Sequence, residues 1–308
     1  MKWWIGAVFG FFVAAALIAA IALGARRSDD RSRTAADSSQ GAAAVCTVVL
    51  PPTPLPLQVR ETSGLADGPA GTLWTHNDAG GKAELFAFDR SGRPVAHVTV
   101  ANAGFVDWED IESGPCAEGR CLFIGDIGDN EETRSHVTIY RVPEPQPGTR
   151  EVEARAIHAR YPDRPQDAES LFAVDGSMYI ITKGEHGPVR LYLLPPDAAD
   201  GDTAVLQLVR ELAPQTNDRA DRVTAATASP DGDVIAFRTY STLYFFDAAT
   251  LLGTGAADSR AFFDLRSLNE PQGEGLALDA NGGVWLSSEA GAGAPLLTGL
   301  ACRYAGNS

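Results

Sequence analysis

Residues 168–194 read AESLFAVDGSMYIITKGEHGPVRLYLL. Apolar, β-branched and aromatic residues form three runs in this stretch, and the turn signal Asp175-Gly176 separates the first run from the second. Such runs predict short strands joined by tight turns. The pattern recurs along the chain, and no long stretch shows a sustained helical period. The sequence therefore predicts an all-β fold.

The pattern occurs five times, with a period near 50 residues. Each copy continues from an opening strand through a turn to a second, a third and an outer strand, which is the plan of a propeller blade. The fifth copy lacks an outer strand because the chain stops soon after Cys302, and the run 45–50 can supply it. These features predict a five-bladed β-propeller rather than a six-bladed one. The equivalent opening positions lie 46, 60, 55 and 50 residues apart and are Ser63, Glu109, Glu169, Thr224 and Glu274.

The four cysteines indicate two disulfides. Cys116 and Cys121 bracket a hairpin-sized loop, and Cys46 and Cys302 lie at the two ends of the predicted propeller. A Cys-x-x-Cys motif is absent from the sequence and its five histidines are scattered, so a zinc site is not expected. The pairs Cys116–Cys121 and Cys46–Cys302 imply an oxidising compartment. Four free buried thiols are the alternative.

The N-terminal segment differs from the rest of the chain. Residues 3–25 carry no charge, and their 23 positions exceed the ~20 needed to cross a bilayer. Region 1–27 is interpreted as a membrane-spanning signal anchor, with a cleaved signal peptide as the alternative. A polar linker over 28–44 and the propeller domain over 45–308 follow. The arginines after the apolar run would favour a cytoplasmic domain, but the cysteines favour an extracytoplasmic one, periplasmic or on the cell surface, or secreted if the segment is cleaved.

The chain is acidic, with a formal net charge of -15. Such a surface excludes nucleic acid as a partner, because phosphate binding needs clustered cations. In a propeller the opening positions of all blades converge on the central channel, which here would gather three carboxylates and two hydroxyls. Three carboxylates at close range need protons or a cation, and a set of oxygen donors suits calcium. The alternative is that these side chains face channel water or cap backbone N–H groups.

The series Ser, Glu, Glu, Thr, Glu at successive blade openings resembles the calcium-activated nucleotidase (apyrase) family. The resemblance covers most of 61–280 and also rests on Trp108-Glu109, on Gly275-Leu276 and on the spacing. It implies a five-bladed propeller in which these five residues are calcium ligands, with Thr224 in place of the usual serine. It does not extend to the nucleotide-contacting residues. The stretches 107–111 and 125–130 are more similar to uncharacterised bacterial secreted propellers.

Polar residues at the ends of the second strands mark a candidate ligand site at the channel mouth. They include Glu185 and Glu289. Asp126 and Asp129 are the candidate general bases for attack by water on a phosphoester. Their stretch could instead be a turn in which Asp and Asn bond their own backbone. The candidate substrate-binding residues are Asn77, Asp78, Arg134, Lys183 and Arg238.

The leading functional hypothesis is a calcium-dependent phosphoester or nucleotide hydrolase with a small-molecule ligand. The alternative is a non-catalytic envelope module that binds a surface partner and keeps calcium for structure. A glycosidase is a third hypothesis, in which Trp74, Trp108 and Trp285 would form a sugar platform.

Overall fold

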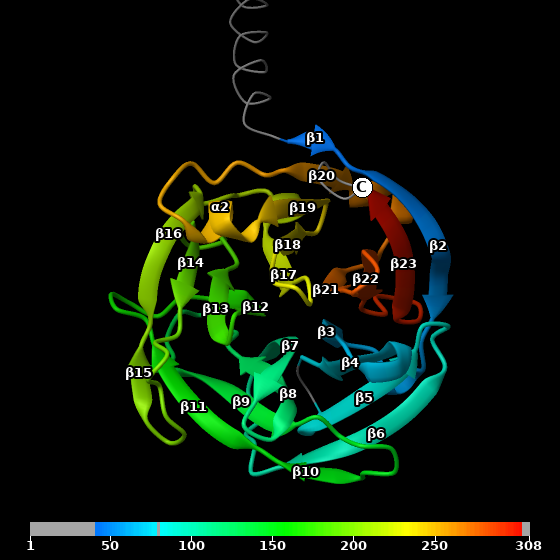
Figure 1. Cartoon of the computed structure of the whole chain (residues 1–308), viewed down its shortest axis with the longest axis horizontal. Helices are drawn as coiled ribbons and strands as arrows, with labels where there is room; N and C mark the ends of the chain where they lie inside the picture. The colour runs from blue at the N-terminus through cyan, green and yellow to red at the C-terminus, as the bar shows by residue number, and fades with distance from the viewer. Residues whose placement is uncertain (1–40, 79–80, 304–308) are drawn as a thin grey trace, which may run out of the picture. The chain divides into compact units, whose positions relative to one another are not determined.

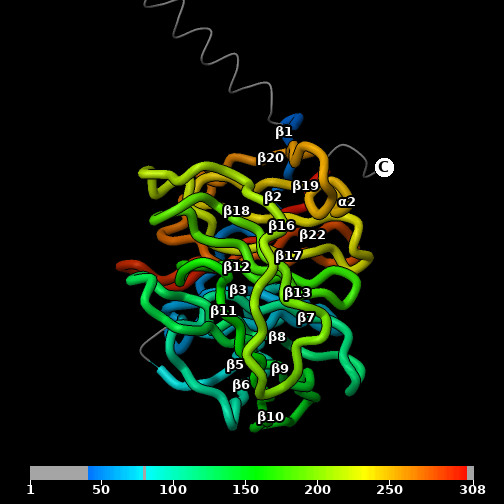
Figure 2. The backbone as a smooth tube through the Cα atoms, turned by 90° about the vertical axis from the view of Figure 1, so that its left-hand side faces the viewer, coloured from blue at the N-terminus to red at the C-terminus, as the bar shows by residue number. Residues whose placement is uncertain are grey.

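The computed structural model describes residues 41–78 and 81–303, which form five mainly antiparallel sheets arranged around a central axis (Figure 1). This confirms the predicted all-β, five-bladed propeller. Figure 2 shows the same ring from the side, with β10 at the end opposite β1 and β20. The predicted signal anchor or signal peptide lies outside the described residues, and none of the helices within them has the length and apolar character of a membrane span.

Blades 1 and 2 each contain five strands. From the axis outward, blade 1 consists of β3 (Thr62–Asp67), β4 (Thr72–Asn77), β5 (Glu84–Asp89), β6 (Pro94–Ala101) and β10 (Glu151–Glu153). Blade 2 consists of β7 (Trp108–Cys116), β8 (Gly119–Asp126), β9 (Val137–Pro143), β11 (Arg155–Arg160) and β15 (Thr203–Val205).

Blade 3 has four strands, β12 (Ala168–Val174), β13 (Ser177–Thr182), β14 (Val189–Leu193) and β16 (Gln207–Ala213). Blade 4 has five, β17 (Val223–Ala228), β18 (Val234–Thr239), β19 (Thr242–Asp247), β20 (Ala261–Asp264) and β1 (Ala42–Ala43). Blade 5 has four, β21 (Gly273–Leu278), β22 (Gly283–Ser288), β23 (Leu296–Arg303) and β2 (Val45–Pro54). The described helical elements are short: α2 (Ala248–Leu252), η1 (Leu57–Val59), η2 (Pro69–Gly71), η3 (Arg219–Asp221) and η4 (Leu265–Leu268).

Blade 5 joins the two ends of the propeller. β2 pairs antiparallel with β23, so the outermost strand of the last blade comes from the beginning of the domain (Figure 1). Cys46 and Cys302 are direct partners in this register and form a disulfide. The second disulfide joins Cys116 and Cys121 across the β7–β8 hairpin. Both disulfides were predicted, and they are consistent with an oxidising, extracytoplasmic environment.

Three short strands were not expected from the sequence. β10, β15 and β1 each pair in parallel with the outer strand of a blade, namely β6, β11 and β20. Each covers the free edge of that blade, where unpaired backbone N–H and C=O groups would otherwise offer a template for another chain. They contain only two or three residues each, which is too short for a hydrophobic pattern to reveal them.

The core lies between neighbouring blades, where alternate residues of facing sheets pack together. Trp74, Trp108 and Trp285 are all buried in it. The indole N–H of Trp74 donates to Glu144 and that of Trp285 donates to Asp279. Because these rings are buried, they are core residues and do not form a solvent-facing sugar platform.

Candidate metal centre at the channel mouth

The five innermost strands, β3, β7, β12, β17 and β21, surround the axis (Figure 1), and each has a register shift near its beginning. In four of them the shift skips one residue, namely Glu109, Glu169, Thr224 and Glu274. In β3 the shift directly follows Ser63, and Gly64 has a φ of 61° there. A β-bulge re-aims a side chain out of the regular alternation of a strand. The predicted ring residues therefore share one local distortion of the backbone.

Glu109, Glu169 and Glu274 meet at this level. Each offers a carboxylate oxygen, and these three oxygens lie within 4.8 Å of one another. All three residues are buried, with relative exposures of 4%, 4% and 3%. Burial, reinforced by the neighbouring carboxylates, raises the pKa of Glu109 and of Glu169 well above the ordinary value and that of Glu274 to about 7. The ring therefore has an excess of negative charge that protons or a cation must compensate.

Lys183 supplies part of the compensation. It follows β13 directly, it is 8% exposed, and its ammonium group forms an ion pair with Glu169. Its Nζ also lies 3.4 Å from Asp167 Oδ2 and 3.4 Å from Asn130 Oδ1. Burial alone would lower the pKa of Lys183, but the carboxylates of Glu169 and Asp167 outweigh it and raise this pKa above the ordinary value. Lys183 was predicted as a substrate-binding cation, and the structure places it against a predicted metal ligand.

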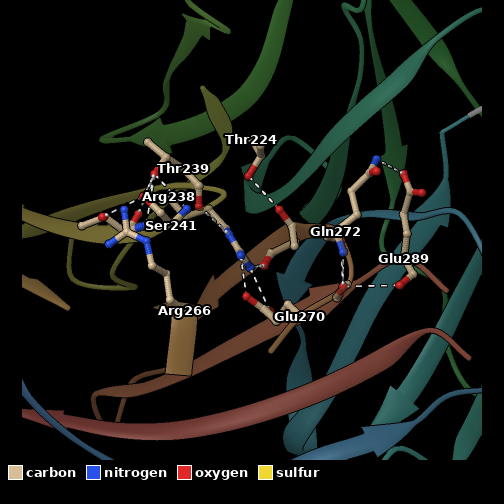
Figure 3. Close-up of polar contacts among 12 residues, drawn as sticks. Thr224, Arg238, Thr239, Ser241, Arg266, Glu270, Gln272 and Glu289 are labelled. Carbon is tan, nitrogen blue, oxygen red and sulfur yellow. Dashed lines mark hydrogen bonds and ion pairs between the residues drawn. The ribbon is translucent and has the colours of Figure 1, made fainter. Parts of the chain in front are cut away.

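The two hydroxyls of the ring hold neighbouring blades together. Ser63 Oγ donates to the backbone carbonyl of Glu109 at 2.6 Å, and Thr224 Oγ1 donates to that of Gly273 at 2.9 Å (Figure 3). Each bond crosses from one innermost strand to the next. Their hydroxyl oxygens keep free lone pairs, and their role as metal ligands stays a prediction.

The donor set of the ring fits a hard cation. Glu169 Oε2 is buried and has no hydrogen-bond partner among the residues that the structure describes. The three carboxylates offer oxygen only, which suits calcium and not the softer metals that prefer His or Cys. The ring could therefore hold calcium through Glu109, Glu169 and Glu274.

Position 128, in the stretch 125–130, has room only for glycine. A Cβ at this position would lie 2.3 Å from Glu109 Oε1 and 2.5 Å from Asp107 Oδ2. The backbone therefore passes directly behind the ring carboxylate, and only glycine leaves room for it. This close approach supports the position of Glu109.

Asp126 and Asp129, the predicted general bases, are held by contacts within their own loop. The carboxylate of Asp126 pairs with Arg134 at 2.8 Å and accepts from the Asp107 backbone N–H at 3.2 Å. Asp129 accepts from the backbone N–H groups of Thr133 and Arg134 at 2.9 and 2.8 Å. Both side chains are buried, and Arg134 is committed to Asp126 and to the Gly128 carbonyl.

The other predicted substrate-binding residues lie in two blades, Asn77 and Asp78 in blade 1 and Arg238 in blade 4. The side chain of Asn77 accepts from Glu61 N–H at 3.1 Å and donates to the Gln58 carbonyl at 2.9 Å. Arg238 is fully buried, and its guanidinium contacts both carboxylate oxygens of Glu270 at 3.2 and 2.6 Å (Figure 3). Asp78 lies near the mouth, where its charge contributes to the raised pKa of Glu289.

Sequence reasoning missed Tyr240 and Gln272, which contact the ring. Tyr240 donates its hydroxyl to Glu274 Oε1 at 3.0 Å. The Gln272 side chain donates to Glu274 Oε1 and to Glu289 Oε1, both at 2.8 Å (Figure 3). Burial, with the charges of Asp78 and Glu61, raises the pKa of Glu289 to about 7.

Most of the polar residues around the ring share one position in their blades, which aligned repeats could have revealed. The residue directly after the second strand of a blade is Asp78 in blade 1, Lys183 in blade 3, Tyr240 in blade 4 and Glu289 in blade 5. Lys183 and Tyr240 contact ring carboxylates, and Glu289 connects to one through Gln272. These positions form a second layer over the ring.

Two further carboxylates of β7 connect it to blades 3 and 4. Asp110 accepts from the backbone N–H groups of Ile111 at 2.9 Å, Leu171 at 2.8 Å and Ala226 at 3.3 Å. Glu112 accepts from Thr227 Oγ1 at 3.0 Å and from Ala228 N–H at 3.3 Å. These bonds hold together three of the strands that carry the ring residues.

No protein-family model matches this sequence, and no curated protein matches it. Solved structures with a similar fold include the PQQ-bound aldose sugar dehydrogenase from Streptomyces coelicolor, with a TM-score of 0.53 and 11% identity over 86% of this chain and 100% of that one. A streptogramin B lyase has a TM-score of 0.42 and 10% identity over 84% and 98% of the two chains. A gluconolactonase from Xanthomonas campestris has a TM-score of 0.42 and 12% identity over 86% and 88%. At such identities the likeness concerns the fold alone, and none of these comparisons supports the nucleotidase family in particular.

Proposed function

We propose that this chain is an extracytoplasmic propeller that binds calcium at the channel mouth and uses the site to hydrolyse a phosphoester. The observation that carries the proposal is the convergence of three buried carboxylates from three blades, of which Glu169 keeps one buried oxygen without a hydrogen-bond partner in the described part of the chain. A group of acids this close is costly to bury unless a cation compensates it.

The residues in and around the ring would have different catalytic roles. Glu109, Glu169 and Glu274 would hold the ion, and calcium when bound supplies a Lewis acid that polarises a phosphoryl oxygen. Glu289 would accept a proton from the attacking water, because a carboxyl pKa of about 7 suits a general base near neutral pH. Gln272 would orient Glu289 through its hydrogen bond. Glu289 is a better candidate than Asp126 or Asp129, whose carboxylates are already engaged with Arg134 and with backbone N–H groups.

Arg219 would receive the anionic part of the substrate. Arg219 is exposed to solvent. Its guanidinium lies 4.5 Å over the Tyr240 ring and donates to Gln272 Oε1 at 2.6 Å. Within the described part of the chain it has no carboxylate partner at ion-pair distance, in contrast to Arg134, Lys183 and Arg238. A guanidinium in this position can bind a phosphoryl group.

The test is phosphate release from a panel of nucleotides, sugar phosphates and phosphodiesters, with calcium and with a chelator. We expect calcium-dependent release that Glu289→Gln lowers by ~100-fold or more, the usual size of a general-base effect. Glu211→Gln is the matched control, because Glu211 lies on the outer strand β16 and its side chain is 55% exposed. Full activity of Glu289→Gln would refute the assigned base.

A second candidate function is a non-catalytic envelope module with structural calcium. The observation that favours it is that Asp126, Asp129, Arg134 and Arg238 are all engaged in internal contacts, which leaves few free groups for chemistry. Calcium that raises the melting temperature without phosphate release from any member of the panel would support this function over hydrolysis.

A further inference from the structure

Lys183 is a buried cation that lies directly against the ring. Its ammonium group contacts Glu169, and Glu169 is one of the three carboxylates that meet within 4.8 Å. The contact is enclosed, since the side chains of Lys183 and Glu169 are 10% and 5% exposed. Charges in such a place are screened far less by salt than exposed ones, so the ammonium acts on anything that enters the ring.

The charges of this group have opposite signs. Three glutamates meet at the ring, and Asp167 lies beside them at the ammonium group of Lys183. Lys183 offsets one of these negative charges. Without Lys183 the ring would favour an ion that carries more positive charge.

We infer that Lys183 is a specificity-determining residue that sets the ring to accept divalent rather than trivalent cations. The inference rests on the proposed cation site. Asp167 also lies 3.4 Å from the ammonium nitrogen, and Asp107 and Arg134 lie around Gly128, beside Glu109. These groups are present both in the wild-type chain and in a Lys183 variant. The interaction of Lys183 with an ion is proportional to the charge of the ion, so its removal favours a trivalent ion more than a divalent one whatever the background.

The experiment compares Ca²⁺ and Tb³⁺ on the purified full chain and on Lys183→Met, which keeps an unbranched side chain without the charge. Tyr240 donates a hydrogen bond to Glu274, so excitation of tyrosine should sensitise Tb³⁺ emission from the ring, and Ca²⁺ is measured by competition. Lys82→Met is the matched control, because Lys82 is an exposed lysine.

We expect Lys183→Met to raise the ratio of Tb³⁺ to Ca²⁺ affinity by ~10-fold or more, as Coulomb interaction at contact distances in a partly buried site implies, and Lys82→Met to leave it unchanged. A ratio unchanged in Lys183→Met, with both ions bound, would overturn the inference and leave the cation site standing. Failure of the wild-type chain to bind either ion would instead refute the proposed function.

A second measurement uses the wild-type chain and so does not depend on the folding of a variant. The sequence contains three lysines, Lys2, Lys82 and Lys183, so ¹⁵N-lysine labelling gives a simple ammonium spectrum. If Lys183 stays as the counter-ion, its ammonium signal should persist and shift when Ca²⁺ binds. Loss of the charged signal, or its merging with the signals of exposed lysines, would show that Lys183 leaves the ring and would overturn the inference.

Discussion

Removal of the disulfide Cys46–Cys302 tests how the propeller is closed. It joins residues 256 apart, whereas Cys116–Cys121 joins residues 5 apart. In the chain-entropy model, closing a loop of the first size removes unfolded-state entropy worth about 5.6 kcal/mol at 25 °C, and closing the short loop removes about 2.2 kcal/mol. The model therefore predicts that Cys46→Ala/Cys302→Ala loses about 3 kcal/mol more than Cys116→Ala/Cys121→Ala.

The assay is urea unfolding of the oxidised wild-type chain and of the two double variants, followed by tryptophan fluorescence. Both variants replace two cysteines by alanine, so the second is a control for the substitution itself. β2 is also expected to exchange its backbone amides faster in the first variant, because only its pairing with β23 then holds the outer edge of blade 5. Equal losses in the two variants, or a larger loss in the control, would refute the reasoning.

Three other predictions concern the axis. Asp110→Ala should lower the free energy of unfolding by about 3 kcal/mol, because it leaves three buried N–H groups without an acceptor, and urea unfolding against the exposed control Asp231→Ala measures it. Burial raises the pKa of Glu112 to about 7, so as pH rises the folded state keeps this proton after the unfolded state has lost it. The free energy of unfolding should therefore fall as pH rises from 4.5 to about 7. Glu112→Gln should flatten this pH dependence, and thermal melts over a pH series measure it. Gly128→Ala should weaken calcium binding by ~10-fold or more, since its Cβ would displace Glu109, and calorimetry would show it.

Much of the fold could be predicted because it depends on local and repeated signals. Turn signals such as Asp175-Gly176 and the period near 50 residues give the blades, and the missing outer strand of the last blade indicates the closure by residues 45–50. The parallel edge strands β10, β15 and β1 could not be predicted. They pair through backbone groups in segments too short to carry a side-chain pattern.

The candidate site was predictable only to the level of the ring. Equivalent positions in aligned repeats pointed to Glu109, Glu169 and Glu274, and the structure brings these together. The ion-pair partner of each cation was not predictable, because a sequence pattern does not fix which carboxylate a side chain reaches. Arg238 was predicted to bind substrate, and the structure pairs its guanidinium with Glu270, 32 residues further along the chain. Lys183 was predicted to bind substrate as well, and the structure places it against Glu169, at the bulge in β12. Both roles stay predictions.

Isothermal titration of calcium into the chelator-treated full chain, beside Glu274→Gln, tests whether the ring binds calcium. Glu274→Gln removes one ring charge, while its amide oxygen can still accept from Tyr240 and Gln272, and it does not touch Lys183. We expect one calcium per wild-type chain and an affinity loss of ~10-fold or more in the variant, the size expected for one partly buried charge. No binding by the wild-type chain, or equal affinity in both proteins, would contradict it.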